Sequence, residues 1–243
     1  MDTITTDTFY NGQLQVRQKR SGYRFSIDAV LLAYHSMPYA AANTVLDLGT
    51  GCGIIPLMLA YHHPKVRICG IEIQEELAHI AALNVEENGM TDQIRILCRD
   101  MKTLKYDMVS GPVELVVSNP PYRKANSGRI NPNQERAIAR HEIKATLSDV
   151  IETAHRMLCT SGRFVTIYPA ERMTDLLTQM RVIGIEPKYL RMIHSERDTE
   201  AKLILAQGIR RGRPGIKVGP PLVIYNEDGT YTDEVNAMYK IEN

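Results

Sequence analysis

Short apolar runs alternate with amphipathic stretches through the middle of the chain, and this alternation predicts the fold class. Five apolar runs have the length and composition of strands: residues 44–48, 66–71, 94–98, 113–118 and 162–168. Apolar residues recur at helical spacing in four further stretches: residues 54–61, 75–87, 147–158 and 170–182. Strands and helices that alternate over short connections predict a mainly parallel sheet with helices on both faces.

The chain after residue 184 follows a different order. Two strands are expected at 185–193 and 201–208 without a convincing helix between them, which predicts an antiparallel pair at the edge of the sheet. Segments 222–225 and 229–231 flank a turn at Asn226-Glu227-Asp228-Gly229 and predict a small hairpin.

The first 42 residues precede the first clear strand and are expected to cover the core. Ser26 suits a helix N-cap, and Asp28 follows in the first turn, where the helix dipole favours an acid. Basic residues around Ser21-Gly22 predict a solvated basic hairpin before that helix. We expect a single domain with this cover segment at 1–42, a catalytic core at 43–210 and a basic tail with the small hairpin at 211–243.

Acidic residues stand at the ends of three successive predicted strands: Asp47, Glu72 and Asp100. The carboxyl ends of parallel strands share one edge of a sheet, where ligands bind. Asp47 opens the sequence Asp47-Leu48-Gly49-Thr50-Gly51-Cys52-Gly53, whose glycines allow backbone N–H groups to approach a ligand. This spacing differs from the dinucleotide fingerprint, which makes NAD a poor candidate. Glu72 can accept hydrogen bonds from the hydroxyls of a ribose, and Asp100 can accept one from an adenine amino group.

The fourth strand ends at Asn119-Pro120-Pro121-Tyr122. Proline fixes φ and removes a donor, so the strand stops there in a stiff turn. The Asn119 side-chain carbonyl and the main-chain carbonyls of Asn119 and Pro120 offer acceptors, while Tyr122 offers a flat ring. This arrangement suits a planar group that carries an amine, whereas the motif taken alone also fits a proline-rich turn without chemistry.

The two motifs together, with Glu72 and Asp100 between them, resemble the class I S-adenosylmethionine-dependent methyltransferases that methylate amino groups. More narrowly, the chain resembles the bacterial family that methylates the N6 of an adenine next to the anticodon of valine tRNA. This narrower resemblance rests on the chain length, on Pro221-Leu222-Val223-Ile224-Tyr225 and on Gly22-Tyr23-Arg24-Phe25-Ser26-Ile27-Asp28-Ala29-Val30-Leu31-Leu32.

The resemblance implies a Rossmann-like α/β fold with seven strands, mostly parallel, the last one antiparallel. It implies that S-adenosylmethionine lies over the carboxyl ends of the first four strands. The implied cofactor-binding residues are Asp47, Gly49, Thr50, Gly51, Gly53, Glu72, Ile73, Asp100, Met101 and Asn119. The implied catalytic residues are Asn119, Pro120, Pro121 and Tyr122: the first two accept the N6 hydrogens, and the tyrosine stacks on the base.

The chemistry of an adenine amine explains why acceptors are needed. Its lone pair is delocalised into the ring, and two acceptors on its hydrogens favour the localised form that attacks. Alignment of nitrogen, methyl group and sulfur then supplies most of the remaining rate. The base must come from a loop or be flipped out of a stack.

The balance of 29 basic and 28 acidic residues gives a formal net charge of +1, so any nucleic-acid footprint must be local. Two basic groups fit one: Arg123, Lys124, Arg129, Arg136, Arg140 and Lys144, and then Arg210, Arg211, Arg213 and Lys217. We expect both groups to flank the mouth of the site and to contact tRNA, although solvated loops would have the same composition.

The four cysteines are far apart and form no C-x-x-C pair, which argues against a metal site and for reduced thiols in a cytoplasm. The start of the chain lacks the features of a signal peptide, and no apolar run approaches the roughly 20 residues that a membrane span needs. We therefore expect a cytoplasmic protein, monomeric or weakly dimeric, without a metal.

Four other functions use similar residues. The acceptors also suit a glutamine side-chain amide, but only about 45 residues precede the first strand, against the extra helical domain of such enzymes. A DNA adenine methyltransferase would need a target-recognition domain. A guanine-N2 methyltransferase of ribosomal RNA usually carries phenylalanine in place of Tyr122. Outside the enzymes, the fold could serve as a silent RNA-binding module, against which the intact Asn119 and Glu72 argue.

Overall fold

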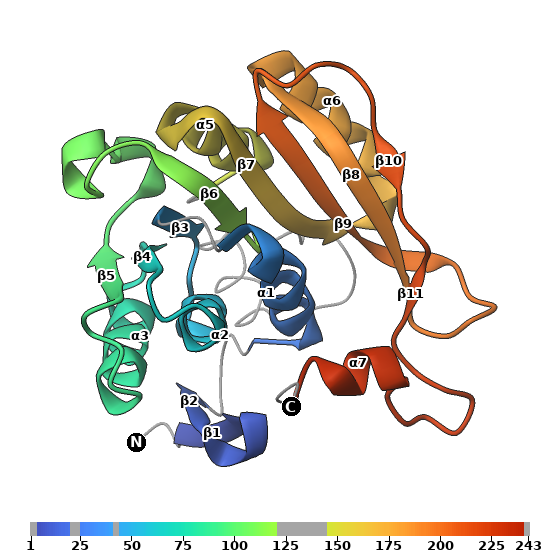
Figure 1. Ribbon diagram of the computed structural model, residues 1–243, viewed down its shortest axis with the longest axis horizontal. Helices are drawn as coiled ribbons and strands as arrows, with labels where there is room; N and C mark the ends of the chain where they lie inside the picture. The colour runs from blue at the N-terminus through green and yellow to red at the C-terminus, as the bar shows by residue number, and fades with distance from the viewer. Residues whose placement is uncertain (1–3, 20–24, 41–43, 121–144, 241–243) are drawn as a thin grey trace, which may run out of the picture.

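The computed structural model describes residues 4–19, 25–40, 44–120 and 145–240. They form a twisted sheet with helices on both faces and a small separate hairpin near the N-terminus (Figure 1). The strands are β1 (Ile4–Phe9), β2 (Leu14–Lys19), β3 (Thr44–Leu48), β4 (Arg67–Glu72), β5 (Ile94–Cys98), β6 (Val113–Ser118), β7 (Leu158–Pro169), β8 (Ile185–His194), β9 (Ala201–Arg210), β10 (Lys217–Val218) and β11 (Leu222–Val223). The α-helices are α1 (Ile27–Ala40), α2 (Ile54–His62), α3 (Glu75–Glu87), α5 (Leu147–Met157), α6 (Met173–Ile183) and α7 (Asp233–Ala237).

The large sheet has the order β10-β8-β9-β7-β6-β3-β4-β5, with β11 also paired to β8. Only β9 runs antiparallel to its neighbours among these described strands. The mainly parallel α/β class is therefore confirmed, and so is the antiparallel direction of the seventh long strand.

Two details of the predicted sheet are wrong. The sheet has nine strands rather than seven, because the C-terminal segment adds the two-residue strands β10 and β11 along the outer side of β8. The antiparallel pair is not simply an edge: the crossover through α6 carries β8 past one strand position, and the direct return of the chain places β9 between β7 and β8.

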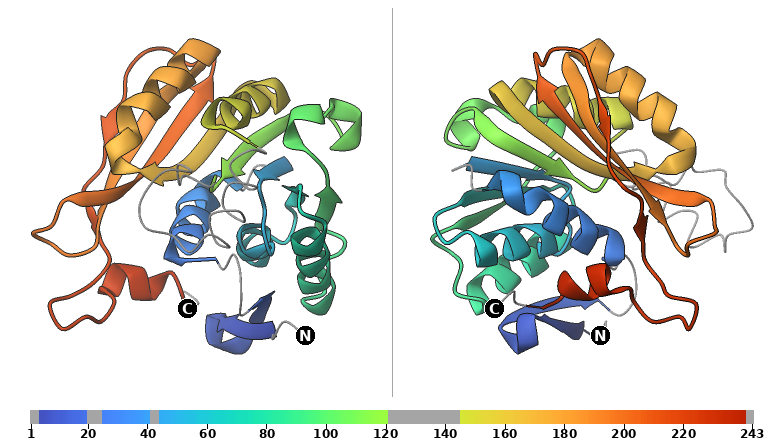
Figure 2. Two further views of the ribbon diagram at one scale, coloured as in Figure 1. Left: turned by 180° about the vertical axis from the view of Figure 1, so that it is seen from behind. Right: turned by 45° about the vertical axis from the view of Figure 1, so that its right-hand side comes forward.

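Alternating side chains of the central strands divide the core into two layers. Val45 of β3 and Leu115 of β6 pack with α1, α2 and α3 on one face, whereas Leu46 and Val116 pack with α5 and α6 on the other. Figure 2 shows these two groups of helices on opposite sides of the sheet. Strands this apolar on both faces are typical of a buried parallel sheet.

The N-terminal segment differs from its prediction. The hairpin is formed by β1 and β2, with its turn around the short 3-10 helix η1 (Tyr10–Gly12), not at Ser21-Gly22. Residues 20–24 lie outside the described residues, and the predicted helix after Ser26 is present as α1. Buried residues alternate along β2, so this hairpin packs on the core rather than standing free in solvent.

Residues near the two ends of the chain meet on the face of the sheet that α1, α2 and α3 cover. The Tyr10 N–H donates to the Tyr239 carbonyl at 3.2 Å, and the rings of Phe9 and Tyr239 stack with their centroids 5.6 Å apart. The predicted C-terminal hairpin is reduced to one antiparallel bridge between Tyr225 and Tyr231, while β11 pairs with β8 instead.

Candidate functional site

The loop between β3 and α2 has the left-handed turns that its glycines allow. Gly49, Gly51 and Gly53 have φ values of 78°, 57° and 86°, a region that other residues rarely adopt. A Cβ on Gly53 would lie 3.3 Å from the Cβ of Ala81, so this glycine also lets α2 start close to α3.

The amides of this loop are already hydrogen-bonded within the protein. Gly49 and Thr50 both donate to the Ile71 carbonyl at 2.9 Å, and Gly53 donates to the Thr50 carbonyl at 2.9 Å. The expectation that these N–H groups face a ligand is therefore wrong for these three residues. Open space does lie beside Gly49, where an added Cβ would meet no atom within 4 Å.

Asp47 is a buried acid without a hydrogen-bond partner among the described residues. Its side chain is fully buried, and neither carboxylate oxygen is paired. Burial raises the pKa of this carboxyl from 3.8 to about 7; the neighbouring Thr50 hydroxyl opposes this rise, and the nearby Glu72 carboxylate adds to it. The Thr50 hydroxyl is likewise buried, and it forms no hydrogen bond of ordinary geometry with Asp47 or another described residue. A buried carboxylate in this state favours a cationic, hydrogen-bond-donating ligand.

Glu72 joins the glycine loop that follows β3 to the loop that follows β4. Its Oε2 accepts the Gly51 N–H at 3.0 Å, and its Oε1 accepts the Gln74 N–H at 2.9 Å. Only 6% of the residue is exposed. Each carboxylate oxygen has a second lone pair, so Glu72 can still accept a ribose hydroxyl while it fixes the glycine loop. Ile73, beside it, is half-buried.

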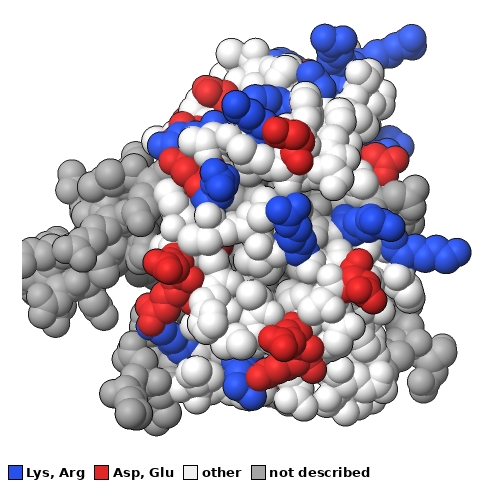
Figure 3. All heavy atoms as spheres, turned by 90° about the vertical axis from the view of Figure 1, so that its left-hand side faces the viewer, with Lys and Arg blue, Asp and Glu red and all other residues white. Residues whose placement is uncertain are grey.

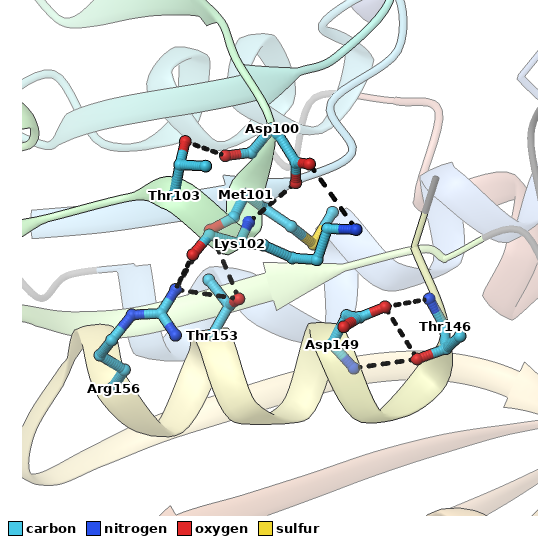
Figure 4. A network of polar contacts seen from close by, with 8 residues as sticks. All are labelled: Asp100, Met101, Lys102, Thr103, Thr146, Asp149, Thr153 and Arg156. Carbon is cyan, nitrogen blue, oxygen red and sulfur yellow. Dashed lines mark hydrogen bonds and ion pairs between the residues drawn. The ribbon is translucent and has the colours of Figure 1, made fainter. Parts of the chain in front are cut away.

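Asp100 and Met101 follow β5 in a short turn that α5 holds in place (Figure 4). Asp100 caps the 3-10 helix η2 (Met101–Thr103), because its Oδ1 accepts the Lys102 N–H at 2.9 Å. The Arg156 guanidinium of α5 donates to the Met101 and Lys102 carbonyls at 3.2 Å each. A capping box of Thr146 and Asp149 starts the same helix.

Asn119 and Pro120 leave β6 at the point where the sheet changes its winding direction. β6 and β3 are neighbours, and the chain proceeds from β3 towards β4 on one side and from β6 towards β7 on the other. Ligands of open α/β sheets bind at such a point. Asn119 is half-buried and Pro120 is buried, whereas Pro121 and Tyr122 lie outside the described residues.

The structure thus brings Asp47, the glycine loop, Glu72, Asp100 and Asn119 to the carboxyl ends of four adjacent strands. It also shows residues that the sequence did not single out. Ser118 and Thr166 are buried hydroxyls beside the Asn119 turn, and Asn84 is a buried amide behind the glycine loop. In the sequence, the only sign of these three residues is that each is a polar residue within a largely apolar stretch.

The second basic group does not flank this site. Arg210 pairs with Ile185, the first residue of β8, and Lys217 pairs with Tyr189. Since β8 runs parallel to β6, Arg210 lies towards the opposite end of the sheet from Asn119. Lys217 lies at the level of Val117, but on β10, which is four strand positions away from β6. The expectation that these two residues border the site is therefore wrong. Arg210 also has a structural contact, because its guanidinium donates to the Leu158 carbonyl.

Charge on the described surface does not mark a single RNA-binding face in the view of Figure 3, where basic and acidic side chains are interspersed. The first basic group, within residues 123–144, lies outside the described residues. Among the residues that are described, His, Cys, Asp and Glu form no group of three suited to a metal, and no helix is both long and apolar enough to cross a membrane.

Comparisons with known proteins agree with this geometry. A family model described as "Methyltransferase small domain" matches residues 25–189. A relative from Porphyromonas gingivalis, named tRNA1(Val) (adenine(37)-N6)-methyltransferase, is 31% identical over 95% of this chain and 92% of its own length. A relative of the same name from Proteus mirabilis is 35% identical over 93% of this chain and 89% of its own length.

Solved structures show the same fold. A predicted O-methyltransferase from Agrobacterium tumefaciens superposes with a TM-score of 0.67 at 20% identity, covering 88% of this chain and 98% of that one. The T. thermophilus 16S rRNA N2 G1207 methyltransferase, in complex with AdoMet and guanosine, superposes with a TM-score of 0.59 at 14% identity, covering 86% and 50%. This chain therefore belongs to the methyltransferase small domain family, together with its relatives named tRNA1(Val) (adenine(37)-N6)-methyltransferase.

Proposed function

We propose that this protein transfers the methyl group of S-adenosylmethionine to the N6 of the adenine next to the anticodon of valine tRNA. This reaction would take place in the cytoplasm. The observation that carries the reaction is the position of the Asn119–Pro120 turn beside the glycine loop at the switch point of the sheet. The substrate follows from the relatives, whose shared name specifies adenine 37 of tRNA1(Val).

The described residues fit S-adenosylmethionine. Its α-amino group carries a positive charge, and the unpaired carboxylate of Asp47 offers a buried acceptor for it. The open space beside Gly49 leaves room for the amino-acid portion. In this proposal Glu72 holds the ribose, and Ile73, Asp100 and Met101 hold the adenine. When bound, S-adenosylmethionine supplies a methyl group activated by its sulfonium charge.

The acceptor side is formed by the Asn119–Pro120 turn. The carbonyl oxygens of this turn accept the two N6 hydrogens of the adenine and so localise its lone pair for attack. The adenine amine would take the methyl group that bound S-adenosylmethionine supplies; sulfur would keep the electron pair of the broken C–S bond, and the amine would then lose one proton to water. Tyr122 would hold the base by stacking, and Pro121 would stiffen the turn. The protein's part is mainly to position two reactants.

The decisive experiment incubates the protein with labelled S-adenosylmethionine and unmodified valine tRNA, then maps the label by nucleoside mass spectrometry. We expect N6-methyladenosine at the position next to the anticodon. A matched tRNA with guanine at that position is the control and should receive no label. Label in N2-methylguanosine, or transfer only to a protein glutamine, would replace the proposed substrate by one of the other acceptors.

A further inference from the structure

The backbone pairing between β3 and β6 stops one residue before the site begins. The last register pair of these strands is Asp47 with Val117. The next residues are Leu48 and Ser118, and here a side chain makes the connection: Ser118 Oγ donates to the Leu48 carbonyl at 2.8 Å. Both residues are fully buried. Leu48 precedes the glycine loop and Ser118 precedes Asn119, so this bond spans the base of the crevice between them.

A second hydroxyl binds the main chain of Ser118 from the other side. Thr166 of β7 is the register partner of Ser118, and its Oγ1 donates to the Ser118 carbonyl at 2.8 Å. Thr166 is also fully buried. The two hydroxyls therefore form a chain across β7, β6 and β3 at the level of the site. Hydrogen bonds in such a dry environment are stronger than in water, and a broken one leaves a buried carbonyl unsatisfied.

We propose that Ser118 and Thr166 are positioning residues for methyl transfer, which set the distance between the glycine loop and the acceptor carbonyls of Asn119 and Pro120. The inference rests on the proposed function. Neither side chain touches a substrate; each acts through the strand ends that it ties together. In-line displacement is sensitive to this distance, since a misplacement of about 1 Å can lower a rate on the order of 100-fold.

A purely structural role for the two hydroxyls makes a different prediction. It would lower the stability of the sheet but leave the turnover of the folded fraction unchanged. A positioning role lowers kcat in a protein that remains folded and binds its ligands normally. The two are separated by measuring kcat and KM for tRNA, S-adenosylmethionine affinity by calorimetry and the melting temperature on the same preparations.

The test compares Thr166→Val, which removes the hydroxyl at nearly equal volume, with Thr166→Ser, which keeps it. We expect Thr166→Val to lose on the order of 10- to 100-fold in kcat, with KM for tRNA and affinity for S-adenosylmethionine within about twofold of wild type. Thr166→Ser should recover most of the turnover. Ser118→Ala should match Thr166→Val, and the double variant should be no slower than the slower single variant, because one broken link already releases the chain.

Ser36→Ala is the matched control, because Ser36 is a fully buried hydroxyl on α1 without a hydrogen-bond partner among the described residues. Its kcat should equal that of wild type. Wild-type turnover in folded Thr166→Val would overturn the inference, as would equal losses in Thr166→Val and Thr166→Ser. An inactive wild-type protein on valine tRNA would instead overturn the proposed function, and the inference with it.

Discussion

Asn84 of α3 pairs with Arg17 of β2 as a neighbouring strand would. Its Oδ1 accepts the Arg17 N–H at 2.8 Å, and its Nδ2 donates to the Arg17 carbonyl at 2.9 Å. The same Nδ2 donates to the Cys52 carbonyl of the glycine loop at 2.9 Å. One fully buried amide thus joins the N-terminal hairpin, α3 and the loop that is proposed to hold the cofactor.

We expect Asn84→Ala to lower the free energy of unfolding by about 1–3 kcal/mol, because it leaves the buried Cys52 carbonyl and the part-buried backbone groups of Arg17 without their partner. Urea denaturation followed by circular dichroism measures this. Asn88→Ala is the control: Asn88 makes the equivalent pair with Gln15 at 3.0 and 2.7 Å, but water can replace its partners at that exposed site. A loss as large in Asn88→Ala would contradict the special role of Asn84.

Glu72→Ala should weaken S-adenosylmethionine binding by roughly 1.5–3 kcal/mol, the usual value of hydrogen bonds to a charged group. Calorimetry on protein shown to be folded is required, because Glu72 also fixes the Gly51 and Gln74 amides. Glu75→Ala, in the exposed first turn of α3, is the matched control and should bind normally. Unchanged affinity in folded Glu72→Ala would remove Glu72 from the site.

Asn119→Ala separates binding from chemistry. The side chain acts on the nucleophile, so its loss should lower kcat by about 100-fold or more while S-adenosylmethionine affinity stays near that of wild type. Single-turnover kinetics with bound valine tRNA measures the chemical step directly. Retention of most of the turnover would show that the amine needs no acceptor from Asn119.

The pH dependence of stability should report on Asp47. Burial raises the pKa of this carboxyl to about 7 in the folded protein, so the folded state holds a proton that the unfolded chain releases near its ordinary value of 3.8. The stabilising contribution is complete below that value and is lost as the pH rises through about 7. Asp47→Asn should flatten the decline in unfolding free energy over this window, whereas Asp92→Asn, at an exposed position, should leave it unchanged.

Binding of a cationic ligand at Asp47 should oppose the preference of the folded protein for the protonated carboxyl. The positive α-amino group of S-adenosylmethionine favours the ionised carboxylate, so binding releases a proton and becomes tighter as the pH rises towards about 8. Calorimetry in buffers of different ionisation enthalpy detects that proton. A ligand affinity that is independent of pH in wild type, and equal in Asp47→Asn, would place the amino group elsewhere.

The sequence predicted the elements that have a strong periodicity. The bounds of α3, β5 and β6 are those expected, because apolar spacing and clear stop signals coincide there. The hairpin β1–β2 was missed because Thr5, Thr6, Asp7 and Thr8 give β1 a polar composition, and its docking on α3 depends on asparagines whose partners are distant in the chain. β10 and β11 are too short to show a pattern of their own.

The site was predictable as a set of strand ends, but its internal contacts were not. The order of residues along the chain indicated that Asp47, Glu72, Asp100 and Asn119 share one edge. Register decides the rest: Ser118 faces the Leu48 carbonyl only because β3 and β6 pair with Asp47 opposite Val117. Similarly, Arg210 is distant from the site because β9 runs antiparallel, so that the end of β9 lies beside the start of β8.

tRNA binding should be salt-sensitive, and the slope should depend on basic residues near Asn119 rather than on those at the other end of the sheet. Each phosphate that a cation neutralises releases condensed counterions, so log K falls linearly with log salt concentration. Arg123 and Lys124 follow the Asn119 turn directly in the sequence, although they lie outside the described residues. Arg123→Gln with Lys124→Gln should lower the slope by roughly one unit per lost contact.

Arg211→Gln with Arg213→Gln is the matched control, since it removes the same charge near the start of β8 and should leave the slope unchanged. Arg210 is left intact in this control, because its contact with the Leu158 carbonyl is structural. Filter binding with unmodified valine tRNA over a salt series measures both slopes, while S-adenosylmethionine affinity should stay constant in all variants. Binding that does not vary with salt, or that is absent, would remove tRNA as the substrate and favour the glutamine amide.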